Sequence, residues 1–107
     1  MVVRHTTLRS NLESIQQHGL DPELAVGKIK GSWCHTPSKT PWAILHTMKR
    51  HGGNPEDVVT IELNIPRGWL RRRNKCLWTI DRRVSSARFV RVIESSEIYC
   101  SPMEDLT

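Results

Sequence analysis

The sequence predicts a single α+β domain, in which a split, mostly antiparallel sheet carries two short helices. Its 107 residues can form one hydrophobic core but not two. The hydrophobic and charged fractions, 37% and 25%, are those of a globular domain and exclude wholesale disorder. Short segments with strand character are interspersed with two segments of helical spacing, in the order strand-helix-strand-helix-strand-strand-strand. We expect this domain to span residues 1–93 and to be followed by an acidic, loosely ordered tail at 94–107.

The first quarter of the chain predicts a strand, a helix and a loop. Residues 2–6 are rich in β-branched side chains and favour a strand. Ser10 and Glu13 have the spacing of a capping box, and Gly19 supplies a left-handed stop, which together predict a helix between them. The glycines and proline of residues 21–31 indicate a loop.

A second strand and helix follow. Residues 32–36 fit a short strand. Thr40 and Pro41 are a good N-cap and first-turn pair, so a helix is expected to begin there and to end at Gly52.

The remainder of the domain is predicted to be strands. Apolar and polar residues alternate strictly over 59–65, which predicts a strand buried on one face. Residues 66–70 should break that strand and turn once. Residues 77–80 and 88–93 are two further strands, separated by a polar turn at 84–86.

Positive charge is concentrated in one part of the chain. Residues 66–93 carry nine Lys and Arg against Asp81 alone, whereas residues 1–65 are close to neutral. A block of this charge indicates a polyanionic partner, either nucleic acid or a phosphate-bearing small molecule. The alternative is a solvated face that only keeps the protein in solution.

Several common functions lack their motifs. The phosphate loop GxxxxGK[ST], the dinucleotide fingerprint GxGxxG and the zinc motif HExxH are absent, and the five histidines lack metal-binding spacing. Cys34, Cys76 and Cys100 form neither a disulfide framework nor a zinc pair, and they indicate free thiols in a reducing cytoplasm. No apolar run approaches the roughly 20 residues of a membrane span, and no secretion signal is recognisable. We therefore expect a cytoplasmic protein with no metal and no membrane partner.

Two polar segments on apolar strands carry a family resemblance. Residues 4–7, Arg-His-Thr-Thr, lead into the pattern NLxxIxxxGL at residues 11–20. Residues 33–38, Trp-Cys-His-Thr-Pro-Ser, lead into Trp-Ala-Ile-Leu at 42–45, and residues 81–90 look like a closing turn and final strand. Together they resemble the small ADP-ribosyltransferase-like fold, whose members include the RNA 2′-phosphotransferases, the rifampin ADP-ribosyltransferases and the DNA-modifying toxins.

The resemblance implies an enzyme that takes NAD as a substrate and modifies a nucleic acid or another phosphate-bearing target. The residues that it implies for catalysis are His5, Thr6 and His35. Those implied for NAD binding are Arg4, Thr7, Trp33 and Thr36. The arginines expected to meet pyrophosphate or the phosphates of the target, which Arg binds in a bidentate fork, are Arg71, Arg72, Arg73, Arg82 and Arg83.

One tryptophan is expected to differ from the other three. Trp33 should wall the cleft that holds nicotinamide, with His35 and Thr36 at its mouth. Trp42, Trp69 and Trp78 are expected to be core residues.

The sequence departs from the family at one position. Many transferases of this fold place a glutamate late in the chain, whereas the corresponding residues 77–79, Leu-Trp-Thr, contain no acid. Glu62, Asp81 and Glu94 are the nearby carboxylates, and Glu62 is expected to be solvated. This departure favours either a branch that works without the glutamate, as the phosphotransferases do, or a protein that binds without catalysis.

Two other functions stay open on the sequence alone. The first is a non-catalytic nucleic-acid-binding module that uses the basic face formed by residues 67–91. The second, less favoured, is an inhibitor whose basic face docks an acidic protein.

Overall fold

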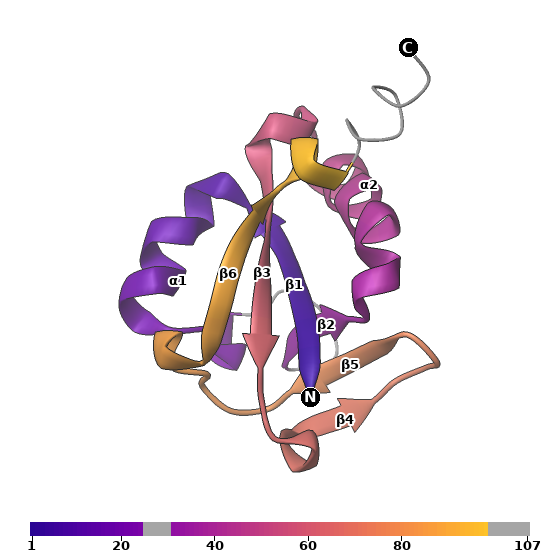
Figure 1. Cartoon of the computed structure of the whole chain (residues 1–107). Helices are drawn as coiled ribbons and strands as arrows, with labels where there is room; N and C mark the ends of the chain where they lie inside the picture. The colour runs from indigo at the N-terminus through magenta and orange to yellow at the C-terminus, as the bar shows by residue number, and fades with distance from the viewer. Residues whose placement is uncertain (25–30, 99–107) are drawn as a thin grey trace.

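A computed structural model describes residues 1–24 and 31–98 of the chain. These residues form one α+β domain with a six-stranded sheet and two helices (Figure 1). The predicted fold class is confirmed at this level. The expected loop over residues 21–31 is described only at its two ends, because residues 25–30 lie outside the described ranges.

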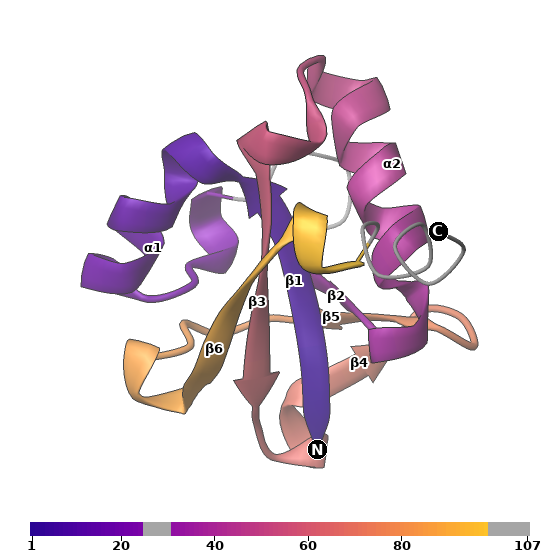
Figure 2. The same ribbon diagram turned by 45° about the horizontal axis from the view of Figure 1, so that its top comes forward.

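Every neighbouring pair of strands in the sheet is antiparallel, and the strand order is β4-β5-β2-β1-β3-β6. The strands are β1 (Val2–Leu8), β2 (Ser32–His35), β3 (Val58–Asn64), β4 (Leu70–Arg72), β5 (Leu77–Ile80) and β6 (Phe89–Glu94). The helices are α1 (Leu12–His18) and α2 (Thr40–His51). The two helices lie on opposite sides of the central strands, as two views of the ribbon show (Figures 1 and 2). None of the described helices has the length and apolar character needed to cross a membrane.

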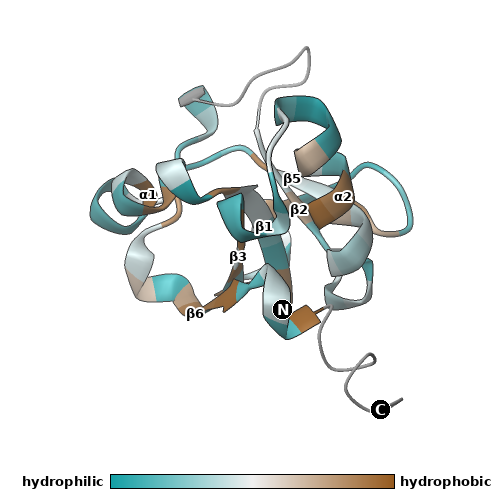
Figure 3. Cartoon of the chain, turned by 90° about the horizontal axis from the view of Figure 1, so that it is seen from above, coloured by the Kyte–Doolittle hydropathy of each residue, from teal (hydrophilic) through white to brown (hydrophobic). Residues whose placement is uncertain are grey.

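The two faces of the central strands differ in chemistry. Side chains alternate across a strand, so β1 presents Val3 and Arg4 to opposite faces. Val3 joins the apolar cluster that contains Ile61 and Leu63, and Leu12 and Ile15 of α1 pack against that cluster. The other face, beneath α2, is polar. Seen from above, the strands lie between the two helices (Figure 3).

The alternation in β3 predicted burial on one face, and this prediction is wrong. The four residues Val58–Ile61 are all buried, including the polar Thr60. The reason is that both faces of β3 are covered: α2 packs against β1 and β3 on one side, and α1 packs on the other against the cluster that contains Ile61 and Leu63. The hydroxyl of Thr60 keeps a hydrogen-bond partner, Thr6, at 2.9 Å.

The predicted helix ends and the predicted start of α2 at Thr40 are confirmed, whereas the predicted capping contacts are not. Gly19 and Gly52 end α1 and α2 with φ of 81° and 73°, in the left-handed region that glycine favours. The N-cap of α1 is Asn11, which makes no cap bond, because residues 9–11 form a preceding 3-10 turn. The N-cap of α2 is Lys39, and the hydroxyl of Thr40 donates instead to the carbonyl of Pro37.

Two further features differ from expectation. The short strand β4, which the sequence did not predict, pairs with β5 at the edge of the sheet. Glu94 still belongs to β6, and Ser95 is buried with its hydroxyl donating to the carbonyl of Val58 at 2.7 Å. The first residues of the segment expected to be loose are therefore attached to the sheet, whereas residues 99–107 lie outside the described part.

Candidate functional site

The sheet divides between β1 and β2. These strands share one registered pair, Arg4 with His35, whereas β1 pairs with β3 along its whole length. Beyond that pair the ladder stops, and the second half of β1 and the start of β2 have no backbone pairing with each other. This split in the pairing, within one six-stranded sheet, lies directly beside the two polar segments.

A cavity of about 860 Å³ occupies this split. Its volume is within the range typical of small-molecule sites. Described residues from both sides of the sheet contribute to the walls, because the gap between the strands opens toward both helices. The described lining includes His5, Thr7, Asn11, Asp21, Trp33, Trp42, His46, Arg50, Leu77 and Arg83.

His5 is held in one tautomer at the cavity wall. Its Nδ1 atom lies 2.6 Å from the carbonyl oxygen of Trp33. Because a carbonyl oxygen only accepts, Nδ1 carries the proton and Nε2 is an acceptor. Burial lowers the pKa of His5 below its ordinary value of 6.5, although the hydrogen bond to Trp33 opposes this shift. No described residue forms a hydrogen bond with Nε2, so a neutral acceptor remains free at the cavity.

Next to His5, the side chains of Thr60, Thr6 and His35 form a chain of hydrogen bonds. Nδ1 of His35 lies 2.9 Å from the carbonyl of Thr36 and must donate to it, which leaves Nε2 to accept from the hydroxyl of Thr6 at 2.8 Å. The hydroxyl of Thr60 then donates to Thr6. Burial lowers the pKa of His35 to about 4, and the nearby positive charge of Arg4 contributes to this shift. His35 is therefore a neutral, buried hydrogen-bonding residue.

Several residues that the resemblance assigned to the ligand site do not line the cavity. His35 and Thr36 were expected at the cleft mouth, but neither belongs to the lining, and His35 is only 4% exposed. Thr6, Thr7 and Trp33 do line the cavity. Asn11 supports Thr7 by donating from Nδ2 to its hydroxyl at 3.2 Å.

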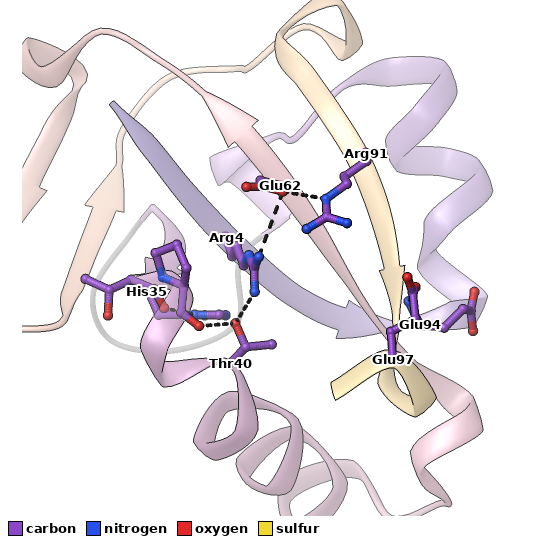
Figure 4. A network of polar contacts seen from close by, with 9 residues as sticks. Arg4, His35, Thr40, Glu62, Arg91, Glu94 and Glu97 are labelled. Atoms are coloured by element: carbon purple, nitrogen blue, oxygen red, sulfur yellow. Dashed lines mark hydrogen bonds and ion pairs between the residues drawn. The ribbon is translucent and has the colours of Figure 1, made fainter. Parts of the chain in front are cut away.

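Arg4 also lies outside the cavity, in an ion-pair network beneath α2 (Figure 4). Its guanidinium donates to the hydroxyl of Thr40 at 3.0 Å and lies 3.9 Å from Glu62. Arg91 donates to the same carboxylate at 2.7 Å. Glu62 was expected to be solvated, yet its side chain is only 15% exposed. Since β1 and β3 place Arg4 opposite Glu62, the strand register holds Arg4 in this network and outside the cavity.

The basic block of the sequence is divided in space. Arg83 reaches the cavity and pairs with Asp21 at 3.4 Å. The guanidinium carbons of Arg82 and Arg88 lie 5.1 Å and 4.6 Å from the ring centroid of Trp69, outside the cavity. Of the other basic residues of the block, Arg91 lies on β6 at the far edge of the sheet. The rest lie on the hairpin formed by β4 and β5 or just before it: Arg67, Arg71, Arg72, Arg73 and Lys75. The five arginines predicted to bind phosphate therefore do not form one site.

Sequence reasoning missed the contribution of α2. Trp42, His46 and Arg50 follow one another at intervals of four, which places them on one helical face. All three line the cavity, and the rings of Trp42 and His46 stack with centroids 5.0 Å apart and planes 14° apart. Their spacing was the signal that could have found them.

Among the tryptophans, Trp33 lines the cavity, as expected, and the clear departure from expectation is Trp42. Trp69 and Trp78 are partly buried against the core. Trp42 is 46% exposed and is not a core residue.

Comparison with known proteins does not identify a family or a function for this chain. No protein-family model matches the chain, and no curated protein matches it in sequence.

The arrangement suits a ligand with hydroxyls and negative charge. Nε2 of His5 can accept from a hydroxyl, and Arg50 and Arg83 provide positive charge on two sides. Asp21 is the one carboxylate among the described lining residues, and Arg83 already partners it. Within the described ranges, no three His, Cys, Asp or Glu side chains gather as a metal site would require.

Proposed function

We propose that this protein is an NAD-binding, ADP-ribosyltransferase-like enzyme that modifies a nucleic acid or another phosphate-bearing target. The observation that carries the proposal is the free Nε2 acceptor of a neutral His5 in the cavity where β1 and β2 separate. A ribose hydroxyl is a matching donor. The bond from Nδ1 to the Trp33 carbonyl fixes the imidazole, so little orientational freedom is lost when the hydroxyl binds.

Charge supports a dinucleotide as the ligand. Arg50 extends from the last turn of α2, and Arg83 comes from the segment after β5. Both line the cavity, whose described carboxylate, Asp21, neutralises only part of their charge. A pyrophosphate between them would receive guanidinium hydrogen bonds, which are stronger than neutral ones.

The reaction needs positioning more than acid catalysis. The bond between nicotinamide nitrogen and ribose C1′ breaks, and nicotinamide leaves with the electron pair. The acceptor forms the new bond to C1′ and gives its proton to solvent. Because the transition state resembles an oxocarbenium ion, holding the ribose and excluding water are the main contributions that this site would make. His5, Thr7 and Trp33 line the cavity and would perform those tasks in the proposed enzyme.

The cavity also bears on which branch of the resemblance applies. Asp21, the carboxylate of its described lining, is engaged by Arg83 rather than free to direct an acceptor. A branch that works without the late glutamate, as the phosphotransferases do, fits such a cavity best. Phosphate recognition by Arg50 and Arg83 would serve that chemistry as well.

A second candidate is a non-catalytic module that binds nucleic acid through the basic face formed by residues 67–91. The observation that favours it is the exposure of Arg71, Arg72 and Arg73 outside the cavity. In the described part of the chain, none of the three has a carboxylate within ion-pair distance.

Thermal melting with NAD separates the two candidates. The enzyme hypothesis predicts that millimolar NAD raises the melting temperature of the native protein and that His5→Ala removes the rise. Lys49→Ala is the matched control, because Lys49 is exposed on α2 and does not line the cavity. A melting curve that NAD leaves unchanged would contradict the enzyme hypothesis. Binding to nucleic acid that weakens steeply with salt and survives His5→Ala would support the module.

A further inference from the structure

A second, smaller cavity adjoins the first. It has a volume of about 200 Å³ and is lined by Lys39, Trp42, Asn74, Cys76 and Leu77. Trp42 and Leu77 line both cavities, so these two side chains stand at the boundary between them. A molecule held in the smaller cavity would therefore be next to a ligand in the larger one.

The wall between the two cavities has an aromatic surface. Trp42 stacks on His46 and is still 46% exposed, which leaves part of the indole for another ring. Stacking of a nucleobase on an aromatic side chain tolerates any base, because every base has a π-face. Lys39 and Asn74 line the smaller cavity beside the indole and offer it an ammonium and an amide group. An aromatic face beside donors and an acceptor is the chemistry that a nucleobase can use.

The outer side of this cavity leads to the basic part of the sheet edge. Asn74 and Cys76 belong to the turn between β4 and β5, and the amide of Thr36 donates to the carbonyl of Cys76 at 3.1 Å. This bond holds the turn beside the start of α2, where both ribbon views place it (Figures 1 and 2). The hairpin carries four exposed basic side chains, none of which has a carboxylate within ion-pair distance in the described part: Arg71, Arg72, Arg73 and Lys75.

We propose that the smaller cavity is the acceptor site and that it takes one base of a single-stranded nucleic acid, whose backbone lies along the β4–β5 hairpin. The proposal rests on the proposed function for the identity of the donor site, and it adds the acceptor class and its location. A duplex hides the faces of its bases inside the stack, so it cannot use Trp42. A single strand can use both the indole and the basic hairpin.

Oligonucleotide binding without NAD tests the acceptor site separately from the donor site. We would measure fluorescence anisotropy with labelled single strands of about 12 nucleotides, in DNA and RNA forms, and with a duplex of the same length. The native protein should bind one of the single strands more tightly than the duplex. Equal or tighter binding to the duplex would overturn the proposal.

Two variants locate the base. Trp42→Ala should weaken single-strand binding by about 5- to 150-fold, the range expected for loss of one stacked base, and Trp42→Phe should restore most of it. Cys76→Phe should fill the smaller cavity, since Cys76 does not line the larger one. That variant should weaken oligonucleotide binding more than tenfold while keeping the rise in melting temperature with NAD. Unchanged oligonucleotide affinity in Cys76→Phe would overturn the acceptor assignment.

A pair of double variants locates the backbone. Replacing Arg71 and Arg72 by Gln should lower the slope of log affinity against log salt by about 1.4, since each single-strand phosphate contact contributes about 0.7. Replacing Arg82 and Arg88 by Gln removes equal charge near Trp69, away from the hairpin turn, and should change the slope much less. An equal decrease of the slope in both double variants would overturn the proposal that the nucleic-acid backbone lies along the hairpin. The NAD-induced rise in melting temperature, recorded on every variant, reports failure of the donor site independently.

Discussion

The side chain of His5 bonds the backbone of Trp33 where the two strands would otherwise pair. The distance from Nδ1 to the carbonyl oxygen is 2.6 Å, and the ladder between β1 and β2 has a registered pair only at Arg4 and His35. One contact thus joins the separated strands, fixes the tautomer of the imidazole and leaves Nε2 at the cavity.

The tautomer predicts the pH dependence of NAD binding. Nε2 of His5 accepts a hydrogen bond only while it is unprotonated, and burial lowers the pKa of His5 below 6.5. Affinity should therefore stay constant from about pH 8 down to pH 6.5 and fall at a lower pH, as the imidazole gains a proton. Isothermal titration calorimetry with NAD at several pH values, from pH 8 to below pH 6.5, measures this affinity. Affinity that rises as the pH falls below 6.5 would show that a protonated His5 is the binding form.

His35 predicts a pH dependence of folding. Its pKa is about 4 in the folded protein, against an ordinary 6.5 when the chain unfolds. Between these values the unfolded state binds a proton that the folded state does not, so stability is full above pH 6.5 and is lost as the pH falls toward 4. The loss should be about 3 kcal/mol.

Urea denaturation at several pH values tests this prediction. His35→Gln cannot titrate, and the Gln side chain can still meet Thr6, so the variant should lose most of the dependence between pH 4 and 6.5. His5 contributes in the same direction and should account for the remainder. An unchanged pH profile in the variant would show that His35 is not the group responsible.

The network beneath α2 predicts an order of stability among variants. Glu62→Ala should destabilise the fold by about 3 kcal/mol, because it leaves the guanidinium of Arg4, only 13% exposed, without its carboxylate. Arg91→Ala should cost clearly less, since the side chain of Arg91 is 55% exposed. Chemical denaturation of both variants gives the comparison. Equal losses would mean that Arg4 does not depend on Glu62.

The two glycines that end the helices form a matched pair. Alanine at Gly52 meets no atom within 4 Å and should cost only the backbone strain of its positive φ with ψ of 176°, about 1–3 kcal/mol. Alanine at Gly19 would place its Cβ 2.4 Å from the carbonyl oxygen of Val84, which accepts the hydrogen bond from Leu20. We expect Gly19→Ala to lower the melting temperature clearly more than Gly52→Ala does. The reverse order would show that the segment at Val84 yields easily.

Local patterns were enough to predict most of the elements. Alternation and turn residues located five of the six strands, and Gly19 and Gly52 located both helix ends. β4 escaped because Leu70–Arg72 is three residues long and carries two arginines, so no alternation can be read in it. The capping box at Ser10 failed because the chain makes a 3-10 turn before α1 begins.

The site was only partly predictable, for a different reason. His5, Thr7 and Trp33 lie next to the split in the sheet, so their strands alone bring them to the cavity. The role of Arg4 depends on its register with Glu62 across β1 and β3, which a single sequence does not reveal. Helical spacing places Trp42, His46 and Arg50 on one face of α2. That spacing predicts cavity residues only when it is known that α2 borders the gap between β1 and β2.

Transfer of label from NAD is the most direct test of the central claim. Purified protein would be incubated with NAD labelled in its adenylate part, together with RNA, DNA or a cell lysate, and compared with His5→Ala and the control Lys49→Ala. The account predicts that label moves to nucleic acid with the native protein and with Lys49→Ala, but not with His5→Ala. Absence of transfer to any of the three, or transfer that persists without His5, would contradict it.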